Sequence, residues 1–203
     1  MVTLTKTMRD KLTPKHALEM VQAGNNRFVT NLKLNRNLLQ QVNETSDEQY
    51  PFAFILSCID SRTSAELIFD QGLGDIFSCR IAGNILNDDI MGSMEFACKI
   101  SGAKIVVVLG HTECGAIKGA CNHLKMGHLT GLLDKISAVI DKDRQEKNGD
   151  QSQYYDSVSK ANVKNVLKQI KEKSPIINEL IAEEKIILIG AMYDISSGIV
   201  EFY

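Results

Sequence analysis

The stretch IVVVL at residues 105–109 is the clearest of three short apolar runs that decide the fold. The other two are FAFIL at residues 52–56 and IILI at residues 186–189. Each run is continuously apolar instead of alternating, which is typical of strands buried on both faces, as in a parallel sheet. Segments with helical patterns separate the three runs. The chain is therefore expected to form an α/β fold with a mainly parallel sheet and right-handed crossovers.

Helical patterns lie between and around these predicted strands. Residues 88–101 (DDIMGSMEFACKIS) combine an acidic start with an apolar stripe. A later helix shows the spacing of one buried face, with apolar residues at Val163, Val166, Leu167 and Ile170. A capping residue followed by proline predicts two further helix starts, at residues 13–14 and 174–175. The first of these helices, running to about residue 30, precedes the first strand and lies outside the repeating unit.

Length and composition fit one ordinary globular unit. The chain has 203 residues, of which 44% are hydrophobic, and a formal net charge of −2. We expect residues 1–203 to form a single domain, with an N-terminal helical arm over about residues 1–45. The polar stretch at residues 143–157 predicts a surface loop between helices, not a domain linker.

Several classes of partner are disfavoured by the sequence. Lys and Arg are not clustered, as phosphate binding would require, so nucleic acid is not an expected partner. No apolar run approaches the roughly 20 residues of a membrane span, and the N-terminus lacks the apolar core of a signal peptide. The five cysteines are an odd number, which favours thiols or metal ligands over a disulfide framework. We therefore expect a cytoplasmic protein without a membrane partner.

Two short motifs directly follow predicted strands. Cys58 opens the segment CIDSR at residues 58–62, and His111 and Cys114 lie in HTECGA at residues 111–116. Ligands of open parallel sheets bind beyond the carboxyl ends of the strands, so the three side chains are expected to converge there. Two thiolates and an imidazole suit Zn²⁺, and three protein ligands leave open the position that catalytic zinc sites keep. From these residues alone two interpretations stay open: a zinc site, or cysteines that only pack in the hydrophobic core.

Together these motifs resemble the signature of the β-class carbonic anhydrases, in which C-x-D-x-R is followed by H-x-x-C-G-A. The resemblance runs from residue 14 to residue 203 and includes FDQGLGD at residues 69–75, RIAGN at residues 80–84 and GSMEFA at residues 92–97. It implies a Rossmann-like, mainly parallel sheet flanked by helices, with an extra N-terminal helix. It also implies homodimers or higher assemblies built from dimers.

A catalytic site is implied by the same resemblance. Zinc would be held by Cys58, His111 and Cys114, with Asp60 and Arg62 as a catalytic dyad. The expected reaction is the reversible hydration of carbon dioxide to bicarbonate and a proton. Zinc acidifies its bound water to hydroxide, an effect for which carbonic anhydrases are the standard example. Asp60 would orient this hydroxide by a hydrogen bond, and Arg62 would keep Asp60 ionised and away from the metal.

Three further residues match substrate-binding positions of the family. Gln49 would bind the substrate, and Phe77 and Phe96 would line an apolar pocket for it. Without the resemblance, Gln49 is an ordinary loop residue and both phenylalanines are ordinary core residues. The chain departs from the family at Ile59, where Ser is usual, and after Arg62, where Pro is common. Neither departure changes a metal ligand.

Two alternative functions stay open at this stage. The same zinc site could hydrolyse carbonyl sulfide or carbon disulfide, which are also linear and apolar molecules. Alternatively, the zinc site could be non-catalytic and stabilise a domain that binds bicarbonate or a partner protein, with Asp60 filling the fourth position on the metal. The presence of both Asp60 and Arg62 favours an enzyme, because a structural zinc site needs no such pair.

Overall fold

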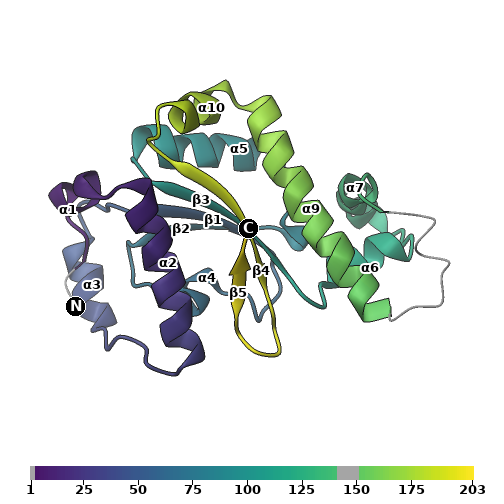
Figure 1. Ribbon diagram of the computed structural model, residues 1–203, viewed down its shortest axis with the longest axis horizontal. Helices are drawn as coiled ribbons and strands as arrows, with labels where there is room; N and C mark the ends of the chain where they lie inside the picture. Colours follow the sequence, from purple (N-terminus) through teal and green to yellow (C-terminus); the bar gives the residue numbers. More distant parts are fainter. Residues whose placement is uncertain (1–2, 141–150) are drawn as a thin grey trace.

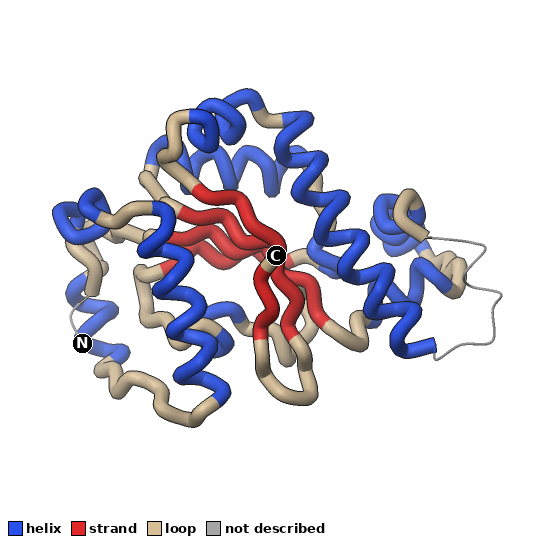
Figure 2. The backbone as a smooth tube through the Cα atoms, in the orientation of Figure 1, coloured by secondary structure: helices blue, strands red, loops and turns tan. Residues whose placement is uncertain are grey.

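The computed structural model describes residues 3–140 and 151–203, which contain a single sheet in the order β2-β1-β3-β4-β5. Its strands are β1 (Ala53–Ser57), β2 (Ile76–Arg80), β3 (Ile105–His111), β4 (Ile187–Tyr193) and β5 (Val200–Phe202). Strands β1 to β4 are parallel, and β5 is antiparallel to β4. The sheet lies in the middle of the molecule with helices on both faces (Figures 1 and 2). The predicted α/β fold with a mainly parallel sheet is therefore confirmed.

The three apolar runs form the inner strands β1, β3 and β4, which lie next to one another. Ala53 is in register with Ile105, and Ile105 is in register with Ile187. The edge strands β2 and β5 contain no continuous apolar run, and the sequence analysis did not identify them. Most side chains of β2 are only partly buried, because one long edge of this strand has no neighbour in the sheet.

Alternate residues of the inner strands face two separate hydrophobic clusters. In β1, Phe54 and Leu56 belong to the cluster that also contains side chains of residues 90–98, 163–170 and 177–180. Ala53 and Ile55 belong to the cluster under the N-terminal helices. Fully burying a side chain such as Leu or Ile stabilises the fold by about 1.5–3 kcal/mol, so both faces contribute. Burial on both faces explains why these runs do not alternate with polar residues.

Helices of the N-terminal half are α1 (Lys6–Lys11), α2 (Pro14–Val29), α3 (Leu38–Glu44), α4 (Ala65–Ile68) and α5 (Asp88–Glu95). Those that follow are α6 (Gly115–Cys121), α7 (Gly127–Ser137), α9 (Gln151–Lys173) and α10 (Pro175–Ala182). A 3₁₀ turn, η1 (Ala82–Asn84), precedes α5, and a π-helical turn, η2 (Phe96–Ile100), extends it. None of the described helices is both long enough and apolar enough to cross a membrane.

Both predicted Pro-led helix starts are confirmed. The Oγ1 of Thr13 accepts a hydrogen bond from the His16 N–H, and the Oγ of Ser174 accepts one from the Ile177 N–H. Such caps satisfy one of the four unpaired N–H groups at each helix start. The prediction of a loop over residues 143–157 is wrong for residues 151–157, which form the first turns of α9. Residues 143–150 lie outside the described part of the chain.

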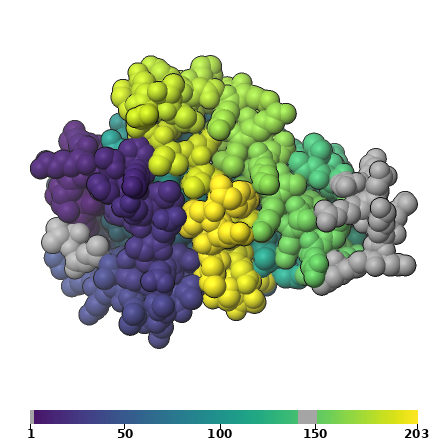
Figure 3. Space-filling model, viewed as in Figure 1, coloured from purple at the N-terminus to yellow at the C-terminus, as the bar shows by residue number. Residues whose placement is uncertain are grey.

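Polar contacts attach the N-terminal helices to the sheet domain. The buried carboxylate of Asp70 accepts hydrogen bonds from the Nε of Arg27 and the Nη1 of Arg36, both at 2.5 Å. In the space-filling view, α2 lies beside the C-terminal residues (Figure 3). There the Asn25 Nδ2 donates to the Gly198 carbonyl, and the Asn25 Oδ1 accepts from the Val200 N–H, both at 2.9 Å. The arm is thus held at two separate places.

Candidate metal centre

Three side chains meet where two neighbouring parallel strands end. Cys58 follows β1, His111 is the last residue of β3, and Cys114 directly precedes α6. All three are buried, with at most 3% of their surface exposed. Their potential ligand atoms lie within 4.8 Å of one another. The structure therefore brings together the three residues that the sequence analysis selected as zinc ligands.

Distances and hydrogen bonds at this cluster fit a tetrahedral zinc ion. The two Sγ atoms lie 3.9 Å apart, and two thiolates on one tetrahedral zinc ion would be separated by about 3.8 Å. The Nδ1 of His111 lies 2.8 Å from the Thr112 carbonyl, which can only accept, so Nδ1 carries the proton. The buried Nε2 of His111 has no hydrogen-bond partner among the described residues, and the ring offers a ligand nitrogen within 4.8 Å of both sulfurs. An imidazole fixed in this way is typical of metal sites.

The two thiols differ in acidity because they are hydrogen-bonded to each other. The bond from Cys114 is the largest of several contacts that lower the pKa of Cys58, to about 4. The same bond, together with burial, raises the pKa of Cys114. One thiolate is therefore present at neutral pH, and a metal cation would favour ionisation of the second.

Asp60 and Arg62 form a forked ion pair beside the cluster. The Nε of Arg62 donates to Asp60 Oδ1 at 2.9 Å, and its Nη2 donates to Oδ2 at 2.7 Å. The backbone N–H of Arg62 also donates to Oδ1. The hydrogen bonds from the Arg62 side chain are the main cause of the lowering of the Asp60 pKa far below its ordinary value. The carboxylate is thus ionised and held in one orientation.

Two residues that the sequence analysis missed hold the backbone of the loop at residues 58–62. The buried hydroxyl of Thr63 donates to the carbonyls of Cys58 and Asp60 at 3.0 and 2.9 Å. Arg80, at the end of β2, donates from Nε to the Cys58 carbonyl at 2.9 Å and from Nη2 to the Asp60 carbonyl. The loop that carries one thiol and the forked pair is thus fixed from two sides.

Helix α9 supports the second motif in a similar way. The Oγ of Ser159 donates to the His111 carbonyl at 3.1 Å. The Oδ1 of Asp156 accepts from the Glu113 N–H at 3.1 Å. Glu113 has a positive φ of 57°, which is uncommon for a residue other than glycine, and this hydrogen bond helps to stabilise that backbone conformation. A polar residue inside the apolar face of a predicted helix, such as Ser159, was the sequence signal that could have identified this support.

A small apolar pocket lies directly beside the cluster. Its volume is about 260 Å³, and Cys58 and Asp60 form part of its wall. The rest of the wall is apolar or lacks a side chain: Ile59, Ala82, Gly115, Ala116, Gly119, Leu124, Leu129 and Leu133. A pocket of this kind suits a small uncharged molecule placed next to a metal-type donor set.

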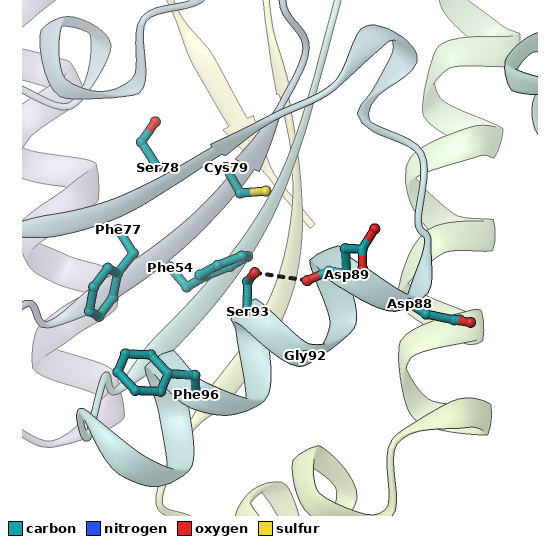
Figure 4. Close-up of a pocket in the computed structure, with 9 residues that line it drawn as sticks. All are labelled: Phe54, Phe77, Ser78, Cys79, Asp88, Asp89, Gly92, Ser93 and Phe96. Atoms are coloured by element: carbon teal, nitrogen blue, oxygen red, sulfur yellow. Dashed lines mark hydrogen bonds between the residues drawn. The ribbon is translucent and has the colours of Figure 1, made fainter. Parts of the chain in front are cut away.

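Neither Gln49, Phe77 nor Phe96 lines the pocket beside Cys58. Gln49 is exposed in the loop before β1. Phe77, on β2, and Phe96, at the start of η2, meet edge to face with ring centroids 6.4 Å apart. Together with Phe54 they line a separate, open pocket of about 700 Å³ between β2 and α5 (Figure 4). Within one chain, the structure therefore separates these three residues from the Cys-His-Cys cluster.

Comparison with known proteins identifies clear relatives. The model of the carbonic anhydrase family matches residues 53–200. Carbonic anhydrase 2 of Mycobacterium tuberculosis is 31% identical over 193 residues, covering 91% of this chain and 90% of the relative. The crystal structure of a β-carbonic anhydrase from Aspergillus fumigatus matches with a TM-score of 0.75 and 26% identity over 81% of each chain.

A second fungal structure shares the same fold. It is one of two tetrameric β-carbonic anhydrases from Sordaria macrospora, with a TM-score of 0.74 and 24% identity. The match covers 93% of this chain and 95% of the fungal chain. The likeness in fold thus extends over nearly the whole chain.

Proposed function

The chain belongs to the β-class carbonic anhydrase family, and on this basis we propose that it hydrates carbon dioxide reversibly at a zinc ion bound by Cys58, His111 and Cys114. The observation that carries the zinc proposal is the buried convergence of two thiols and an unpartnered imidazole Nε2. Bound zinc supplies Lewis acidity, which makes water nucleophilic near neutral pH, and carbonic anhydrases are the standard example of this effect. Three protein ligands leave one coordination position for that water.

We assign the orientation of the attacking water to Asp60. The ionised carboxylate of Asp60 lies on the wall of the pocket and can accept a hydrogen bond from the water. Accepting this bond fixes the direction in which the water's lone pair points. Arg62 occupies both carboxylate oxygens, so Asp60 cannot turn towards the two sulfurs and take the open position. The apolar wall formed by Leu124, Leu129 and Leu133 would hold the uncharged carbon dioxide.

Substrate binding by Gln49, Phe77 and Phe96 remains a prediction. None of the three residues lines the pocket beside Cys58. The variants Gln49→Ala and Phe77→Ala test the prediction. We expect a raised KM with unchanged zinc content, because these side chains contact no proposed zinc ligand. An unchanged KM in both variants would remove the two residues from the substrate site.

We also propose that the protein is a homodimer or a larger assembly of dimers. Helix α3 of the N-terminal arm exposes three apolar side chains, Leu38, Leu39 and Val42, which is unusual for a face in contact with water. One structural relative is described as tetrameric. Light scattering of the purified protein tests this proposal, and a monomer at micromolar concentration would contradict it. We further propose that residues 1–203 form one domain with an N-terminal helical arm over about residues 1–45.

The decisive experiment measures carbon dioxide hydration by stopped flow and zinc content on the same sample. We expect turnover together with bound zinc in the wild type, and loss of both in Cys58→Ala. Bound zinc without turnover of carbon dioxide would refute the proposal and favour the non-catalytic alternative. Faster turnover of carbonyl sulfide or carbon disulfide than of carbon dioxide would instead favour the other alternative.

A further inference from the structure

Helix α9 carries polar side chains on a face that is otherwise apolar. Val158, Val163 and Val166 of this helix are buried. Ser159 and Asn162 lie among them and are only 2% and 1% exposed. Burying an amide or a hydroxyl costs free energy unless it is hydrogen-bonded, so each of these residues needs a partner. Ser159 finds one in the His111 carbonyl, as described above.

Asn162 reaches the other motif through Gly83. Its Nδ2 donates to the Gly83 carbonyl at 2.8 Å, and both groups are buried. The N–H of Gly83 in turn donates to the Sγ of Cys58 at 3.3 Å. A continuous line of contacts therefore joins the middle of α9 to one of the proposed zinc ligands, with 79 residues of sequence between Asn162 and Gly83 and 25 between Gly83 and Cys58.

The backbone of Gly83 adopts an uncommon conformation that neighbouring contacts help to stabilise. Its φ is +67°, a conformation that residues with a side chain rarely adopt. A Cβ at this position would lie 2.7 Å from Ile136 Cδ1 and 3.3 Å from the Ala116 Cβ. Glycine therefore fits closely, yet it is also the residue with the greatest backbone freedom. The N–H and the carbonyl of Gly83 lie in adjacent peptide planes, so contacts at both ends limit the φ and ψ that this residue can adopt.

We propose that Asn162 is a positioning residue for the metal centre, holding Gly83 so that the Gly83 N–H points at the Cys58 sulfur. This inference rests on the proposed zinc site. A hydrogen bond to a thiolate stabilises its negative charge and fixes the direction of its remaining lone pairs. Loss of such an outer contact typically weakens metal binding by about 10–100-fold. If Asn162 served only to pair a buried carbonyl, its removal would cost stability and leave metal affinity unchanged.

The test compares Asn162→Ala and Asn162→Leu with a matched control, Val166→Ala. Leucine has the branched shape of asparagine and is somewhat larger but has no donor, so the two variants separate the missing donor from the missing volume. Val166 is a buried residue of the same helix, and it belongs to a different hydrophobic cluster from Cys58. Zinc dissociation constants are measured by competition with a chromophoric chelator. The thiolate-to-metal absorption band of the cobalt(II) form and thermal unfolding of the metal-free protein are recorded in parallel.

We expect both Asn162 variants to bind zinc about 10–100-fold more weakly and to shift the cobalt band. Val166→Ala is expected to lower the unfolding temperature while keeping wild-type zinc affinity and an unchanged band. Wild-type zinc affinity in a folded Asn162 variant would overturn the inference, as would an equal loss of affinity in Val166→Ala. If the wild type itself binds no zinc, the proposed function fails and the inference fails with it.

Discussion

Replacing Arg62 with alanine removes the two side-chain hydrogen bonds that hold Asp60, at 2.9 and 2.7 Å. The Arg62 side chain is 51% exposed, so solvent weakens both bonds, and their loss is expected to act mainly on the orientation of the Asp60 carboxylate. The backbone bond from residue 62 to Asp60 Oδ1 is retained in the variant. Because a misplaced catalytic group can cost up to about 100-fold, we expect kcat to fall by about 10–100-fold in this variant.

The pH dependence separates loss of orientation from loss of charge. Arg62 is the main cause of the lowered pKa of Asp60, so in Arg62→Ala this pKa rises towards its ordinary value. That value, about 3.9, is still well below neutral pH, so Asp60 remains ionised there. Raising the pH above neutral therefore does not restore the lost activity. Arg62→Lys keeps the charge but not the fork, and we expect an intermediate kcat.

Stopped-flow hydration at several pH values, with zinc content measured on each sample, tests this reasoning. We expect zinc content to stay at the wild-type level, because Arg62 is not a proposed ligand. Wild-type kcat in zinc-loaded Arg62→Ala would refute the role of the forked pair. Recovery of full activity at high pH would show that charge, not orientation, was lost.

Three further predictions concern stability and metal binding. Asp70→Ala removes the carboxylate partner of the buried Arg36 guanidinium, which keeps its bond to the backbone carbonyl of residue 70, and we expect it to lower the free energy of unfolding by about 3–5 kcal/mol, measured by urea denaturation. Gly83→Ala places a side chain at φ +67°, and we expect this strain to lower the free energy of unfolding by about 1–2 kcal/mol in the same assay. The close contact of the new Cβ with Ile136 adds to this loss. An unchanged denaturation midpoint would contradict the prediction. Zinc affinity is expected to fall as the pH falls, because protons compete with the metal for the thiolates of Cys58 and Cys114, and chelator titrations at two pH values measure this.

The central sheet was predictable from residues 52–56, 105–109 and 186–189, because a strand buried on both faces must be apolar at every position. The edge strands β2 and β5 were not predictable in this way. Side chains of β2 are only partly buried, so composition does not distinguish this strand from a loop. Its place in the sheet follows from pairing with β1, a contact between segments that are distant in the sequence.

By itself, the sequence determined the type of fold and the three side chains of the candidate metal centre. Cys58 follows the buried strand β1, while His111 ends β3 and Cys114 lies three residues further on, and neighbouring parallel strands bring their ends to the same edge of the sheet. Only the tertiary structure decided what surrounds this centre. The contacts from Arg80 and Asn162 cross 22 and 79 residues of sequence, and the hydrogen bonds form only when the chain is folded. Phe77 and Phe96 are close to the motifs in sequence but line a different pocket, because packing between distant segments decides where a side chain lies.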